Sequence, residues 1–105
     1  MKYFVFSLAL AISTAAHAEE VIQVFEGNGA HTTRPFTTEG PWEIQWDAEG
    51  DIFQLYLFSS NGDLLGLPAN QMGSGTGSAF QPQAGSFYLQ MNAIGSWSVS
   101  IISID

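Results

Sequence analysis

The chain has 105 residues, no Cys and a formal net charge of −8, with 10 acidic residues against 2 basic ones. A chain this short forms one domain, which must be held together by packing because it has no disulfides. A nucleic-acid-binding protein needs a basic surface and anionic membranes attract basic segments, so this charge excludes the first and disfavours the second. A basic protein partner, a divalent cation or a need for solubility are all compatible with it.

The first residues have the pattern of a secretory signal peptide. Lys2 supplies a positive start, residues 4–12 form an apolar run, and residues 16–18 (Ala-His-Ala) fit the small-x-small rule for cleavage. The alternative, an N-terminal membrane anchor, is disfavoured because the run is far shorter than the ~20 residues of a spanning helix. We therefore expect a signal peptide at 1–18 and an exported domain, periplasmic or secreted, at 19–105.

The exported segment is expected to consist of short strands, without a helix. In residues 42–47 Trp, Ile and Trp alternate with Glu, Gln and Asp, which is typical of a half-buried antiparallel strand. Asn61-Gly62 predicts a hairpin. The Gly/Ser-rich residues 73–78 are expected to form a flexible loop within a poorly ordered stretch, residues 68–83. The other predicted strands are residues 20–26, a short piece ending at 36, and residues 52–59, 64–67, 86–92 and 96–104.

These elements predict an all-β domain, namely an antiparallel β-sandwich or jelly roll of six to eight short strands. The reason is that turn signals recur about every 8–12 residues. Trp42, Trp46 and Trp97 fall on the apolar side of alternating strands, so we expect them in the core. Trp42 stands at the start of its strand and is therefore also kept as a candidate binding residue.

Two stretches resemble the bacterial pre-peptidase C-terminal domain and related small exported sandwiches. They are DIFQLYLFSSNGDLLG (residues 51–66) and QAGSFYLQMNAIGSWSVSI (residues 83–101), with residues 35–37 (Pro-Phe-Thr) similar to the first strand of that family. The family's Asp-x-Asp before the first core strand is absent. The resemblance implies a β-sandwich that accompanies a secreted enzyme, and it spans residues 33–104. The positions that match are Gly85, Phe87, Tyr88, Leu89, Trp97, Val99 and Ile101.

One sheet face is the main candidate for a binding surface. If the alternate apolar residues of the 52–59 strand point inward, its other side chains point outward, and those of the 86–92 strand join them if the two strands are neighbours. Tyr rings and amides together suit a sugar or a protein contact. A loop formed by residues 68–83 could instead cover this face, or the face could mediate self-association. The candidates are Gln54, Tyr56, Phe58, Tyr88, Gln90 and Asn92.

Other chemistry has weaker support. Asp47, Glu49 and Asp51 surround Gly50, and closely spaced carboxylates at a Gly turn suit Ca²⁺, although turn-forming acids are the ordinary interpretation. No other cofactor is expected. Catalysis is disfavoured because His31 would be the only His of the exported segment and no Ser lies in a nucleophile-elbow motif.

The function predicted is an exported, non-catalytic binding or accessory module with a protein or cell-envelope partner. A carbohydrate-binding module with exposed aromatic residues is the alternative. A third possibility is an inhibitor of a basic secreted enzyme, because ten acids against Arg34 alone would speed the encounter. Small periplasmic lysozyme inhibitors are similar in size and acidity, but residues 74–78 lack the Tyr of their Ser-Gly-x-x-Tyr motif. The sequence leaves the oligomeric state open.

Overall fold

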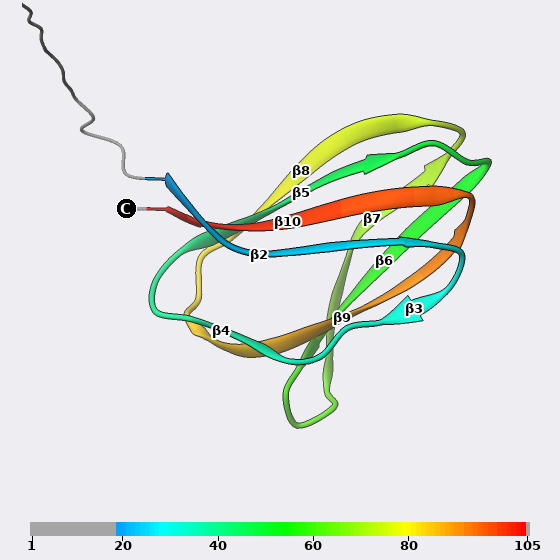
Figure 1. The fold of residues 1–105 in the computed structure, drawn as a ribbon. Coiled ribbons are helices and arrows are strands. Elements are labelled where there is room, and N and C mark those ends of the chain that lie inside the picture. Colours follow the sequence, from blue (N-terminus) through cyan, green and yellow to red (C-terminus); the bar gives the residue numbers. More distant parts are fainter. Residues whose placement is uncertain (1–18, 105) are drawn as a thin grey trace, which may run out of the picture.

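The protein is described by a computed structural model that covers residues 19–104, and the predicted signal peptide lies outside them. These residues form two antiparallel sheets packed face to face (Figure 1). The part of the chain described contains no helix long and apolar enough to cross a membrane. The strands are β2 (Glu19–Asn28), β3 (His31–Thr32), β4 (Phe36–Thr38), β5 (Trp42–Ala48), β6 (Ile52–Ser59), β7 (Leu64–Met72), β8 (Gly75–Gln81), β9 (Gly85–Ile94) and β10 (Ser96–Ile104).

The strand order is that of a jelly roll, which confirms the predicted fold class. The upper sheet in Figure 1 has the order β2-β10-β5-β8, and the lower sheet has the order β3-β9-β6-β7, with β4 also paired to β9. The short β3 and β4 act as one interrupted strand, so there are eight strand positions, at the top of the predicted range. Consecutive strands alternate between the sheets except for the β6–β7 hairpin, so every other strand pairing joins strands that are not consecutive in the chain.

The period-2 patterns form strands as predicted. The inward apolar residues of β5, β6, β9 and β10 are buried, apart from half-buried Trp46 and Ala93, and their neighbours are exposed or half-buried, apart from buried Ile102. The predicted hairpin is also present, since Gly62 has φ 96° and its N–H donates to Ser59 O at 2.9 Å. A residue without Cβ takes this φ at little cost.

The prediction of a flexible loop at residues 73–78 is wrong. Only Gly73 and Ser74 turn the chain, and β8 begins at Gly75 and pairs with β5 along its whole length. The predicted strand at 64–67 is likewise too short, since β7 continues to Met72. Composition misleads here because the inward positions of β8 need small residues: a Cβ at Gly77 would overlap the ring of Trp46.

Aromatic rings fill the space between the sheets. At the end near the termini, Trp42 contacts Phe36 edge-on, with ring centroids 5.4 Å apart, and packs on Phe87 at 4.9 Å. At the other end Phe53 lies between Trp46 and Trp97, at 6.4 and 6.5 Å. Because large rings bury the most area per residue, this packing supports a small core that has no disulfides.

Candidate functional site

The six polar and aromatic residues of the candidate surface lie together on the outer face of the lower sheet. Strands β6 and β9 are antiparallel neighbours, so the six residues form three direct cross-strand pairs. We call this surface the neutral face. Its pairs are Phe58 with Tyr88, Tyr56 with Gln90, and Gln54 with Asn92.

Each end of the neutral face has its own chemistry. Phe58 and Tyr88 stack with ring centroids 5.0 Å apart and planes 13° from parallel. At the other end, Asn92 donates to Gln54 Oε1 at 2.9 Å, and Gln54 donates to Asn70 Oδ1 at 3.3 Å. Cross-strand pairs of this kind fix side-chain direction, so rings and amides are held in place before any ligand arrives.

Residues that sequence reasoning missed extend the neutral face. Asn70 completes the amide row from β7, and large apolar side chains lie in line with the pairs: Leu64 faces Phe58, while Met72 and Ile94 both face Ile52. Leu64, Met72 and Ile94 are 60%, 80% and 58% exposed. If the strand predicted at residues 64–67 had been continued past Pro68, the sequence would have predicted these outward-facing residues of β7.

No loop within residues 19–104 covers the neutral face. Residues 68–83 were the alternative cover for this face. They instead form the end of β7 and the whole of β8, one in each sheet. Four of the six side chains are half-buried by their neighbours, and Gln90 and Asn92 are exposed. The surface is therefore open to a partner.

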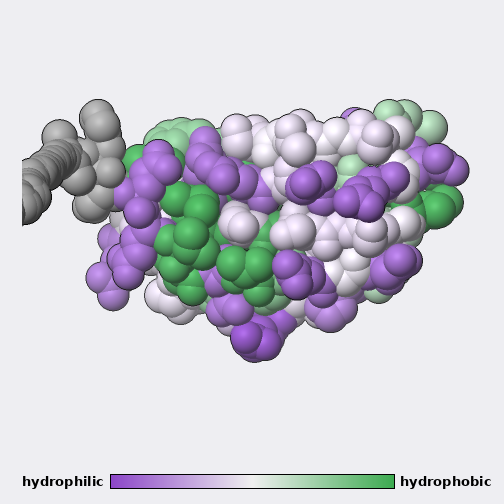
Figure 2. Space-filling view, turned by 45° about the horizontal axis from the view of Figure 1, so that its top comes forward, coloured by the Kyte–Doolittle hydropathy of each residue, from purple (hydrophilic) through white to green (hydrophobic). Residues whose placement is uncertain are grey.

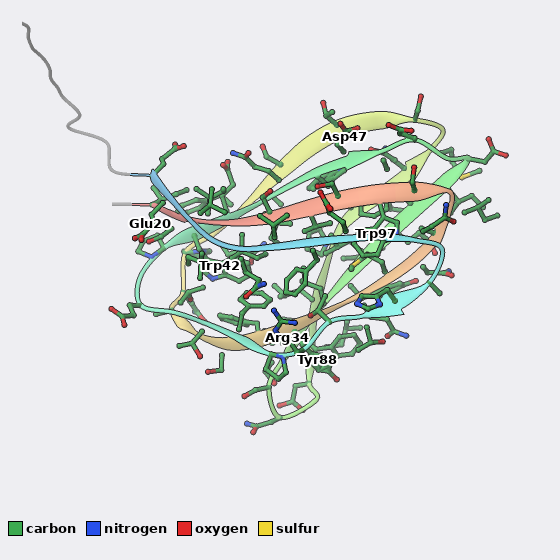
Figure 3. All side chains as sticks on the ribbon, viewed as in Figure 1. Glu20, Arg34, Trp42, Asp47, Tyr88 and Trp97 are labelled. Atoms are coloured by element: carbon green, nitrogen blue, oxygen red, sulfur yellow. The ribbon has the colours of Figure 1, made fainter. Side chains whose placement is uncertain are left out.

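Charge is divided unequally between the two sheets. The five strands of the lower sheet contain no Asp, Glu, Lys or Arg. Arg34, the single Arg or Lys among residues 19–104, is exposed between β3 and β4 at the edge of this sheet (Figure 3). The acids of the described residues lie on upper-sheet strands (Glu19, Glu20, Glu26, Glu43 and Asp47) or in connections (Glu39, Glu49, Asp51 and Asp63).

Trp42 does not belong to the binding surface. Its side chain is fully buried between the sheets (Figure 3), and its indole N–H donates to Gln83 O at 2.9 Å. Trp97 is also buried, and Trp46 is half-buried against the core. The expectation that Trp42 could contact a ligand is therefore wrong, because a strand-start position on an inward face still lies under the opposite sheet.

The structure does not gather Asp47, Glu49 and Asp51 into one metal-binding group. Among residues 19–104 no three His, Cys, Asp or Glu side chains come close enough together to hold a metal ion. Asp47 points away from the core on the upper sheet, while Glu49 accepts a hydrogen bond from Ser96 Oγ at 3.4 Å. Gly50 packs against the backbone at Gly95, so this turn is a close strand contact.

His31 is exposed at the edge of the lower sheet, and its ring lies beside that of Trp97. It lies on β3 opposite Met91, and its ring centroid is 5.8 Å from that of Trp97. The indole N–H of Trp97 donates to Gly29 O at 2.8 Å, which holds this corner together. The observed contacts of His31 are therefore packing contacts.

A shallow recess lies on the outer face of the upper sheet. Its volume is about 480 Å³, and it is wide open to solvent. The lining has four hydroxyl side chains, one carboxylate, one amide and the indole of Trp46, so it is mixed in polarity. The residues are Gln45, Trp46, Asp47, Thr76, Gly77, Ser78, Ser98 and Ser100.

Comparison with known proteins adds no family to this description. No protein-family model and no curated protein matches the sequence. The resemblance to the pre-peptidase C-terminal domain thus stays a prediction that rests on its hydrophobic and Gly positions.

Proposed function

We propose that the protein is an exported, non-catalytic binding or accessory module, and that its neutral face contacts a protein or another component of the cell envelope. One observation carries this proposal: the outer face of one sheet is free of charge, although nine acids lie elsewhere on the described chain. The centres of protein interfaces are depleted in charge and enriched in Tyr, Phe and Met. The neutral face, together with the exposed Leu64, Met72 and Ile94 beside it, has this composition.

A protein partner fits the neutral face better than a polysaccharide. A sugar-binding platform needs open ring faces, whereas Phe58 and Tyr88 each cover one face of the other. The amide row of Gln54, Asn70 and Asn92 favours the carbohydrate alternative, because amides can bond to sugar hydroxyls. Two hydrogen bonds already join these three amides in a row, which lowers their capacity for a ligand.

Photocrosslinking tests this proposal. A photoreactive phenylalanine analogue is placed at Gln90, in the middle of the neutral face, and the cells that produce the protein are irradiated. The matched control carries the same analogue at Ser78, which is also exposed but lies on the upper sheet. We expect a discrete protein adduct from position 90 and none from position 78.

Either of two results would overturn the proposed contact: equal adducts from both positions, or no adduct from position 90. An adduct that a polysaccharide-degrading enzyme removes would favour the carbohydrate-binding module instead. Both variants carry the same analogue at an exposed strand position, so their comparison reports on the sheet rather than on the probe.

A further inference from the structure

Strand β2 is an open edge of the upper sheet. It pairs with β10 on one side, and no described strand pairs with its other side (Figure 1). A register shift opposite Ile101 and Ile102 bends its beginning, while residues 23–28 run in regular register. An unprotected edge exposes a row of backbone donors and acceptors to which another strand can bond.

The other edges are interrupted or short, as native edges usually are. Strand β7 contains Pro68 and two register shifts, and Pro35 separates β3 from β4. Strand β8 is shorter than β2, and Pro82 follows it directly. Strand β2 has neither Pro nor Lys and, with ten residues, is the longest edge strand described, so it is the edge best suited to pairing.

The hydrogen-bond pattern shows which groups of β2 are free. Gly29 N–H donates to Gly95 O at 3.0 Å, and this pair continues the register of β2 with β10. In an antiparallel ladder, bonded and non-bonded pairs alternate, so Gln23, Phe25 and Gly27 also bond to β10. The backbone groups of Val24 and Glu26 therefore point to the open edge.

The side chains of β2 indicate what kind of strand would pair there. Val21, Ile22 and Val24 are 57%, 37% and 46% exposed, and apolar side chains gather at this end of the upper sheet (Figure 2). The same strand carries Glu19, Glu20 and Glu26, without a basic residue. Apolar contact and charge complementarity together favour an extended segment in which Val-like and Lys- or Arg-like residues alternate.

We infer that β2 adds a strand from a partner, namely an extended basic and apolar polypeptide segment that bonds to Val24 and Glu26. The site lies on the upper sheet and is independent of the neutral face. A second copy of this chain fits less well, because β2 carries three Glu and no basic residue, so two paired β2 strands would bring together acidic charges alone.

The probe is a synthetic ten-residue peptide of alternating Lys and Val, labelled for fluorescence anisotropy and titrated with the protein from residue 19 onward. The test variant is Val24→Pro, which removes a backbone donor that points away from β10 and so leaves the β2–β10 ladder intact. The control is Val24→Thr, which keeps both the donor and the β-branched shape. All three proteins have the same charge.

We expect Val24→Pro to bind the peptide about tenfold more weakly than the parent protein, because this variant loses one backbone hydrogen bond and close contact. The affinity of Val24→Thr, which keeps both, should stay within about twofold of that of the parent. Equal affinities for both variants would mean purely electrostatic attraction and would overturn the inference. Absence of binding to the parent protein would also overturn it, as would self-association that Val24→Pro abolishes. Trp emission of each variant shows whether it is folded.

Discussion

At the scale of single residues, this core depends on glycines that face tryptophans across the strands of the upper sheet. Gly77 on β8 is paired with Trp46, and Gly27 on β2 is paired with Trp97. A Cβ at Gly27 would lie 2.7 Å from Trp97 Cζ2, closer than real side chains approach. The rings occupy the volume that a second side chain would need, so in each pair a large ring from an inner strand covers a glycine on an edge strand.

Substitution Gly77→Ala should therefore destabilise the domain through overpacking. We expect a loss of about 1–3 kcal/mol in the free energy of unfolding, which corresponds to about 4–8 °C in Tm for each kcal/mol. Thermal unfolding followed by circular dichroism measures it. The control is Gly75→Ala on the same strand, where the nearest atom is the flexible Gln71 amide at 3.5 Å. An unchanged Tm for Gly77→Ala would contradict this account of β8.

At the scale of elements, the side chain of Gln71 stabilises the connection between β7 in the lower sheet and β8 in the upper sheet. The chain leaves β7, turns at Gly73 and enters β8. Inside this turn Gln71 accepts a bond from Trp46 Nε1 at 3.1 Å and donates to Gly73 O and Gly75 O, at 3.3 and 3.2 Å. One amide therefore ties β7, β5 and β8 together, at a corner where the two sheets share no ladder.

Substitution Gln71→Met should loosen this corner. It leaves the Trp46 N–H and two carbonyl groups without partners, and such a loss costs about 1–3 kcal/mol. Urea unfolding measures the difference. The matched control, Gln45→Met, removes an amide that bonds only to exposed Glu43 on the outer face, so its effect should stay within about 0.5 kcal/mol. Equal losses in the two variants would argue against the role of Gln71.

At the scale of the whole molecule, charge and apolar packing are separated. The acids lie on the upper sheet and in the connections, the neutral face lies on the lower sheet, and the rings lie between the sheets. The like charges of the upper sheet thus repel one another through solvent rather than through the core, where screening would be weak. An acidic protein can in this way keep an uncharged surface for a partner.

The buried rings predict the fluorescence of the folded protein. We expect Trp emission at short wavelength and weak quenching by acrylamide, with both properties lost in one transition on unfolding, because Trp42 and Trp97 are buried and Trp46 is half-buried. Acrylamide is neutral, so the negative charge of the protein does not repel it. Strong quenching of the folded protein would contradict the packing of the core.

Local patterns determined much of this protein without the structure. Alternation fixed which side chains of β5, β6, β9 and β10 are inward, since each residue of a strand points opposite to the next. For the same reason the six residues of the neutral face were recognised as outward-facing. Their binding role remains a proposal.

Only the tertiary structure decided which strands are neighbours. The pairing of β6 with β9 assembles the neutral face, and the position of β2 at an edge leaves Val24 and Glu26 unpaired. It also decided that Gly75 and Gly77 belong to a strand and that Trp42 is fully buried. Alternation is a property of the nearest residues in the chain, whereas pairing and burial depend on residues far along it that fill the space beside a strand.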